Sequence, residues 1–221
     1  MASNEVSFWL SLIQVAHPEQ KRLFRYQLHQ LIWRAFPGFS AGSKQPFLFT
    51  LTGREDHEGI YCLVQSATKP DWQKATQKNG CNSLIINKLH GVKSVCFTVH
   101  PGDQFFFQID ACPVKNIFQG RHQRGKKAPI YNHVEAEQWF QRRAEQNGFT
   151  VLQNELYIKK NRIRSKADLN GKDITLVTSH FSGLLEVKNE KRFAEALLTG
   201  IGKKKIFGFG LLMLSPASET N

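Results

Sequence analysis

A histidine and a tyrosine stand three positions apart in a segment with helical character. Tyr26 and His29 lie within residues 19–36, and Pro37-Gly38 follows as a helix stop. On an ideal helix each residue advances about 100°, so positions three apart are neighbours on one surface. Imidazole titrates near neutral pH and acts as a general acid or base, and a phenol beside it donates or accepts hydrogen bonds. This pair is therefore a candidate for proton-transfer chemistry.

The rest of this helix separates into two faces. An apolar stripe is expected to pack on the core, and it consists of Phe24, Leu28, Leu31, Ile32 and Ala35. The opposite, solvent side is expected to gather Arg22, Tyr26, His29 and Trp33. Such a group combines a guanidinium for a phosphate, aromatic rings for a base and one titrating proton. The alternative is a surface histidine without a chemical role.

Cleavage of RNA by its own 2′-hydroxyl suits these groups. The nucleophile belongs to the substrate, so the protein needs only a proton acceptor, a proton donor and positive charge near the phosphate. The sequence shows no dense Asp and Glu cluster of the kind that holds catalytic magnesium. We therefore expect neither a metal ion nor another cofactor.

The chain carries a large excess of basic residues. Its 221 residues include 30 Lys and Arg against 18 Asp and Glu, a formal net charge of +12. This excess favours polyanionic partners, of which nucleic acid is the usual one and an anionic membrane surface the competitor. No segment has the length of a transmembrane helix, and four cysteines without CxxC spacing indicate a reduced, cytoplasmic protein without a zinc site.

Three basic clusters are candidates for phosphate contacts. One is a loop with Arg124, Lys126 and Lys127, and a second is a hairpin candidate with Lys159, Lys160, Arg162, Arg164 and Lys166. The third is the glycine-rich loop, residues 200–210, with Gly202, Lys203, Lys204 and Lys205. Glycines let a backbone approach phosphates closely. The alternatives are a mobile surface loop for the second cluster and a turn with solvated lysines for the third.

Strand and helix patterns follow an order that occurs twice. In the first half, strands are expected at 6–15, 47–52, 60–66, 84–86 and 94–99, and helices at 19–36 and 70–79. In the second half, strands are expected at 105–111 and, as one long strand or a pair of strands, at 174–187, and helices at 135–147 and 190–199. This order predicts an α+β protein of two tandem ferredoxin-like (RRM-like) domains, 1–101 and 102–221, with a C-terminal glycine-rich loop.

Six segments carry a family resemblance that covers nearly the whole chain. They are YQLHQ at 26–30, PFLFTL at 46–51, LVQSA at 63–67, FQIDACPVK at 107–115, RGKKAP at 124–129 and GIGKKKIFGFGLLML at 200–214. In their order and spacing they resemble the CasE family, the CRISPR repeat-processing endoribonucleases of the type I-E Cascade system.

The resemblance implies a more specific function than the residues do alone. It implies metal-independent cleavage at the 3′ base of a CRISPR repeat hairpin, with a 2′,3′-cyclic phosphate or its 3′-phosphate as product. The catalytic histidine of the family corresponds to His29 and its active-site tyrosine to Tyr26, and we assign a catalytic lysine to Lys160. The enzyme is expected to keep its RNA product and to join the other Cascade subunits. A non-catalytic RNA-hairpin-binding module is the alternative.

Overall fold

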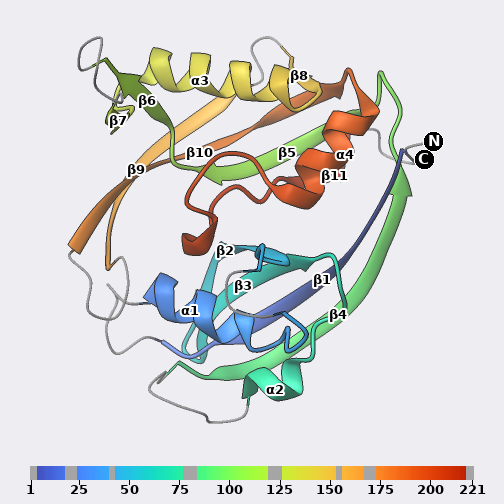
Figure 1. The fold of residues 1–221 in the computed structure, drawn as a ribbon, viewed down its shortest axis with the longest axis vertical. Helices are drawn as coiled ribbons and strands as arrows, with labels where there is room; N and C mark the ends of the chain where they lie inside the picture. The colour runs from blue at the N-terminus through green and yellow to red at the C-terminus, as the bar shows by residue number, and fades with distance from the viewer. Residues whose placement is uncertain are drawn as a thin grey trace.

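The computed structural model describes residues 4–17, 24–39, 43–76, 84–118, 126–152, 156–166 and 173–217. The described strands form two larger antiparallel sheets and one short two-stranded sheet. The larger sheets belong to the two halves of the chain, which lie one above the other in Figure 1. In these ranges no helix is long and apolar enough to cross a membrane.

The first sheet combines four strands with two connecting helices. Their bounds are β1 (Glu5–Val15), α1 (Phe24–Trp33), β2 (Phe47–Asp56), β3 (Gly59–Ser66), α2 (Trp72–Thr76) and β4 (Ile86–Thr98). The strand order is β2-β3-β1-β4, and each pair is antiparallel. Together with the β-α-β-β-α-β chain order, this is the ferredoxin-like arrangement.

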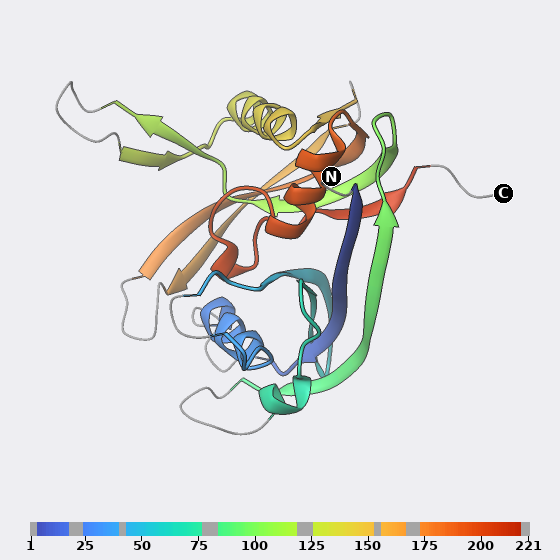
Figure 2. The same cartoon turned by 45° about the vertical axis from the view of Figure 1, so that its right-hand side comes forward.

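The second sheet repeats this arrangement with additions. Its elements and their neighbours are β5 (Gln104–Ala111), β6 (Val114–Ile117), β7 (Lys126–Pro129), α3 (His133–Gln146), β8 (Phe149–Val151), β9 (Tyr157–Lys166), β10 (Asp173–Val187), α4 (Glu190–Thr199), η1 (Lys205–Phe207) and β11 (Met213–Pro216). The order β11-β5-β10-β8 matches that of the first sheet, and β9 pairs with the first part of β10. The β6–β7 hairpin extends away from the body (Figure 2). The predicted fold class is thus confirmed.

The two halves share part of their core. Val6 and Phe8 of β1 belong to the same buried cluster as Phe107 of β5 and Phe193 of α4. Helix α4 packs against β1, and the buried amide of Gln65 in β3 donates a 2.6 Å hydrogen bond to the carbonyl of Leu197 in α4. These contacts fix the first sheet relative to the second, and so they fix the elements that meet at the site.

Both predicted helices of the second half are present, and residues suited to helix ends flank them. The Asn189 side chain accepts a 3.0 Å hydrogen bond from the backbone N–H of Arg192, so it caps the N-terminus of α4. Gly148 adopts a positive φ of 81° directly after α3, which is the expected end of that helix.

Two predicted boundaries in the first sheet are wrong. The strands expected at 84–86 and 94–99 are parts of one strand, β4, and the expected turn at 53–59 is strand up to Asp56. In both cases the strand residues are mostly exposed, because β4 is an edge strand and β2 extends beyond the core. Exposed strand positions carry polar residues without strict alternation, so the sequence resembles a loop there.

Candidate active site

Helix α1 lies on the first sheet through the predicted apolar stripe. Phe24, Leu28, Leu31 and Ile32 are buried in one cluster with Phe47 of β2 and other side chains of the sheet. Burial of such a stripe fixes the rotation of a helix about its axis. It therefore also fixes where Arg25, Tyr26 and His29 point.

His29 lies in an aromatic environment instead of facing solvent. Its ring centroid is 5.6 Å from that of Phe47, 5.8 Å from Trp33 and 6.5 Å from Phe49. The side chain is half-buried. The predicted solvent-side position of His29 and Trp33 is thus wrong, because strand β2 covers this side of the helix as well.

The side chain of Gln45 determines which nitrogen of His29 is free. The Gln45 amide nitrogen donates a 2.7 Å hydrogen bond to the carbonyl of Phe47, which turns its Oε1 toward the imidazole. Nε2 of His29 lies 3.1 Å from this oxygen and must donate to it. The free lone pair is then on Nδ1. Burial lowers the pKa of His29, and the Gln45 hydrogen bond offsets only part of that effect, so the ring is a neutral base at pH 7.

Tyr26 lies on the same helix, one turn before His29. Its half-buried hydroxyl accepts a 3.1 Å hydrogen bond from the side-chain amide of Gln30. A phenol that accepts one hydrogen bond can still donate its own proton to a substrate atom. Tyr26 and His29 thus both lie on α1, three positions apart.

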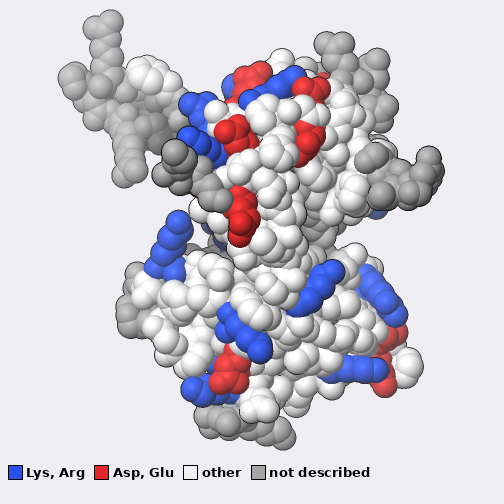
Figure 3. Space-filling view, turned by 90° about the vertical axis from the view of Figure 1, so that its right-hand side faces the viewer, with Lys and Arg blue, Asp and Glu red and all other residues white. Residues whose placement is uncertain are grey.

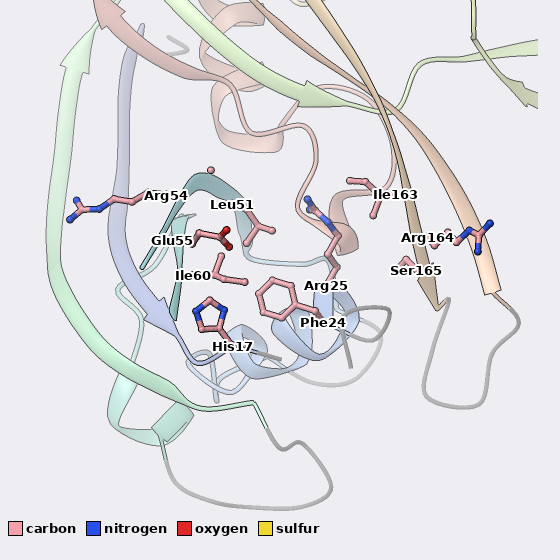
Figure 4. A pocket seen from close by; sticks show the side chains of 11 residues that line it. His17, Phe24, Arg25, Leu51, Arg54, Glu55, Ile60, Ile163, Arg164 and Ser165 are labelled. Carbon is pink, nitrogen blue, oxygen red and sulfur yellow. The ribbon is translucent and has the colours of Figure 1, made fainter. Parts of the chain in front are cut away.

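The glycine-rich loop packs on α1. Arg25 donates a hydrogen bond of 2.5 Å to the carbonyl of Phe207, and its guanidinium lies 4.7 Å from the centre of the Phe209 ring. Burial lowers the pKa of Arg25, an effect that the nearby Asp110 opposes. Figure 4 shows Arg25 rising from α1 into a cavity of about 370 Å³ that β2 and Ile163 of β9 also line. Arg25 thus links the loop to the helix that carries His29.

Two lysines bring positive charge to this junction. Lys205 is half-buried, its ammonium donates to the carbonyl of Thr199, and its pKa is lowered first by burial and then by the charge of Lys44. Lys44 directly precedes Gln45, the partner of His29. Lys44, Gln45 and Arg25 were missing from the predicted site. Arg25 stands one helical turn before His29 and could have been found from that spacing, whereas the other two lie in a loop without a periodic signal.

The second basic cluster forms the hairpin strand β9. Lys159, Arg162 and Arg164 are exposed there. Lys160 donates a 2.7 Å hydrogen bond to the carbonyl of Tyr131, and the Arg162 guanidinium lies 5.0 Å from the Tyr131 ring centre. The structure thus places the Lys160 ammonium at the start of α3 and not beside His29.

The other predicted residues lie on two further elements. Lys126 and Lys127 are exposed on β7, and Lys203 and Lys204 are exposed on the glycine-rich loop. Gly202 adopts a φ of 88° in that loop. Arg22, Arg124 and the side chain of Lys166 lie outside the described residues.

The surface charge differs between faces. The face on the right of Figure 1 carries acidic as well as basic side chains (Figure 3). By contrast, β9 carries lysine or arginine at five of its ten positions and no acidic residue. A polyanion is therefore attracted to the side of β9. Among the described residues, no group of three or more His, Cys, Asp or Glu side chains is arranged to hold a metal ion.

Comparison with known proteins identifies the family. The model of the CRISPR associated protein family matches residues 8–216. This chain belongs to that family. It is 26% identical over 215 residues to the CRISPR system Cascade subunit CasE of Escherichia coli, with 94% of this chain and 99% of the relative covered. It is also 26% identical over 200 residues to the CRISPR-associated endoribonuclease Cse3 of Thermus thermophilus, with 86% and 90% covered.

The fold agrees with a solved member of the family. A structure of Thermus thermophilus Cse3, bound to an RNA that represents a pre-cleavage complex, matches this chain with a TM-score of 0.76. The match covers 96% of this chain and 100% of the other at 22% identity. The two CRISPR associated proteins thus share their tandem ferredoxin-like architecture.

Proposed function

We propose that this CRISPR associated protein is a metal-independent endoribonuclease that cuts CRISPR repeat RNA at the 3′ base of the repeat hairpin. The observation that carries the proposal is the half-buried His29, a neutral base whose free nitrogen is fixed by Gln45. It lies at a junction with Lys44, Lys205 and Arg25, in a relative of proteins named CasE and Cse3 endoribonuclease.

The reaction needs one proton removed and one proton supplied. Nδ1 of His29 takes the proton of the 2′-hydroxyl as its oxygen attacks the adjacent phosphorus. The bond from phosphorus to the 5′-oxygen of the next nucleotide breaks, and that oxygen receives a proton from the Tyr26 hydroxyl. The products are a 2′,3′-cyclic phosphate on one fragment and a 5′-hydroxyl on the other. Tyr26 then recovers its proton from solvent, and His29 releases one.

The positive groups around His29 stabilise the transition state. The pentacoordinate phosphorus carries more negative charge than the starting diester, so fixed cations lower its energy. Lys205 is suited to this because it is half-buried, where water screens its charge less. Lys44 adds a second charge beside it. These two lysines take the catalytic place that the sequence assigned to Lys160.

The same elements offer a surface for the hairpin stem. We place the stem backbone on β9, with Arg162 and Arg164, and on the exposed lysines of β7 and the glycine-rich loop. The cut RNA stays bound, and the protein joins the other subunits of a Cascade complex in the cytoplasm. The catalytic helix and the hairpin strand belong to two domains, 1–101 and 102–221, which meet at the turn after β4.

A cleavage assay with the protein's own repeat tests this function. The substrate is a transcript of the CRISPR repeat from the same genome, and a transcript with a scrambled stem is the control. We expect one cut at the 3′ base of the hairpin and none in the control. Tight binding of the hairpin without any cut would instead indicate a non-catalytic RNA-binding module.

The cleavage rate is expected to fall at acid pH. Because burial places the pKa of His29 below its ordinary value of 6.5, the ring is neutral at pH 7 and accepts a proton. Protonation of Nδ1 removes the base, so the single-turnover rate should decrease as the pH falls through a value below 6.5. The measurement is this rate as a function of pH.

Variants of Gln45 provide the control for this pH profile. In Gln45→Glu a carboxylate faces the imidazole and stabilises its protonated form, which raises the pKa of His29. The acid limb of the profile, where the rate falls with falling pH, should therefore move to higher pH. In Gln45→Met the hydrogen bond is lost, and the limb should move to lower pH. A rate that rises as the pH falls, or a limb that both variants leave in place, contradicts the role of His29 as the base.

Contacts between β9 and phosphates predict a change in salt dependence. Arg164→Ala should weaken hairpin binding and reduce the slope of log K against log salt by about 1, because one phosphate contact is lost. Lys93→Ala, which removes an exposed lysine from β4, is the matched control and should leave the slope unchanged. Equal slopes for wild type and Arg164→Ala would remove β9 from the RNA interface.

A further inference from the structure

The second sheet has one face that its helices do not cover. Side chains alternate between faces along a strand, and Phe107, Ile109 and Phe181 point into the core shared with α3 and α4. The residues that alternate with these along the strands therefore point to the other side of the sheet, which we call the open face. Its members include Phe106, Gln108 and Asp110 of β5, Met213 of β11, His180 and Ser182 of β10, and Tyr157, Lys159 and Asn161 of β9.

Two aromatic side chains stand exposed on the open face. Phe106 is 50% exposed and Tyr157 is 61% exposed, although large aromatic residues usually bury most of their surface. The strand registers place Phe106 opposite Leu184 and Tyr157 opposite Ser182, on two sides of β10. From strand spacing and rise, their backbones are about 12 Å apart. We call this pair the aromatic platform.

Hydrogen-bonding groups lie around the platform. Gln108 and Ser182 pair across β5 and β10, and both line a cavity of about 480 Å³ with Phe106 and Met213. An amide and a hydroxyl can each donate to and accept from a base edge. Aromatic faces with such groups between them are the composition of sheets that bind unpaired RNA bases.

The open face becomes positively charged toward the first half of the chain. A cavity of about 510 Å³ there is lined by Tyr157, Lys159, Asn161 and His180, and by Arg25 from α1. The carboxylate in this cavity, Asp110, is 2.9 Å from Nδ1 of His180 and also lies near the Arg25 charge. Its negative charge is thus partly compensated, and Lys159 remains exposed for a phosphate.

We propose that the open face binds unpaired nucleotides next to the repeat hairpin, by stacking bases on Phe106 and Tyr157. Lys159 contacts their phosphates, and Gln108 and Ser182 contact base edges. The direction of the strand follows from Arg25, which lines the cavity and stands one helical turn before His29. A single strand on the platform therefore leads toward the catalytic helix. This inference rests on the proposed RNA substrate.

Two RNAs separate the platform from hairpin recognition. One is the repeat hairpin alone, and the other is the same hairpin with short unpaired tails on both sides. Base stacking on an aromatic residue contributes enough that its loss should weaken binding about tenfold or more. We expect the wild-type protein to bind the tailed RNA more tightly, and Phe106→Ala and Tyr157→Ala to lose that advantage. All variants should bind the bare hairpin equally.

Further variants distinguish stacking from other uses of an apolar face. Phe106→Tyr keeps an aromatic ring and should retain the tail effect, whereas Phe106→Leu keeps only apolar bulk and should lose it. Leu198→Ala removes an exposed apolar side chain from α4 and is the control with an unchanged tail effect. A thiouridine in the tail should crosslink to β5 or β9 of the wild-type protein.

The outcomes are distinct for the platform and for the proposed function. If the hairpin is bound and cut but its tails change neither affinity nor crosslinks, the platform does not bind RNA. Its aromatic residues then belong to a protein contact, and our inference is overturned. If the bare hairpin is neither bound nor cut by wild type, the proposed function itself fails. Melting temperatures of the variants show whether a loss of binding reflects a loss of fold.

Discussion

His29→Ala should lower the single-turnover rate of repeat cleavage by about 10²–10⁴-fold, the usual contribution of a positioned general base. Affinity for the uncut hairpin should change little, because the contacts with the stem lie on other elements. The ring packs on Phe47 and Trp33 and is only half-buried, so its removal should leave the fold intact. The measurements are the cleavage rate, the hairpin Kd and the melting temperature.

A second histidine and added imidazole serve as controls for this variant. His90 is exposed on the edge strand β4, with its ring 5.0 Å from that of Tyr61, and His90→Ala should cut at the wild-type rate. Free imidazole can enter the space left in His29→Ala and should restore part of the rate. Undiminished cleavage by His29→Ala, in a protein that remains folded, would falsify the assignment of the base.

Gly208→Ala should have the second largest effect, on both stability and cleavage. Gly208 has a φ of 78°, and a Cβ there would lie 2.7 Å from Cε2 of Phe49 and 3.3 Å from Nη1 of Arg25. The left-handed backbone costs a residue with a Cβ about 1–2 kcal/mol, and overpacking typically costs a further ~1–3 kcal/mol. The loop must move away from Phe49 of β2 and Arg25 of α1, so Lys205 is displaced and the cleavage rate falls.

Gly202→Ala is the matched variant within the same loop. Its φ of 88° carries the same backbone cost, but its Cβ would meet Cη2 of Trp139 at 3.5 Å, an ordinary contact. The free energy of unfolding should therefore fall less than in Gly208→Ala, by about 1–3 kcal/mol. Denaturant unfolding measures this difference, and equal losses would show that the glycine-rich loop does not pack tightly on Phe49 and Arg25.

The order of the elements could be predicted because burial leaves a periodic trace. The stripe of α1 and the apolar runs of β1, β2 and β5 follow helix or strand periods. The sequence predicts two short strands in place of β4, because most side chains of β4 are exposed at a sheet edge. The pattern of apolar residues shows which positions are buried. It predicts a strand only where one face of that strand is buried and the other is exposed.

The candidate site could be predicted only in part, because it combines segments distant in the chain. The helical period shows which residues share a face with His29, but it does not show that Phe47 and Phe49 of β2 cover that face. The helical period also does not show that Lys205, from the other end of the chain, lies near Lys44. Lys160 belongs to a basic cluster in which the alternation along β9 decides the direction of each side chain, and the sequence alone does not show which of these side chains point toward His29.

The chemistry of the cut ends tests the proposed mechanism most directly. The protein's own repeat transcript is cut in excess EDTA, and the ends of both fragments are identified by mass spectrometry. Attack by the 2′-hydroxyl predicts undiminished cleavage, with a 2′,3′-cyclic phosphate upstream and a 5′-hydroxyl downstream. Loss of cleavage in EDTA, or a 3′-hydroxyl opposite a 5′-phosphate, would contradict a reaction driven by His29 without a metal ion.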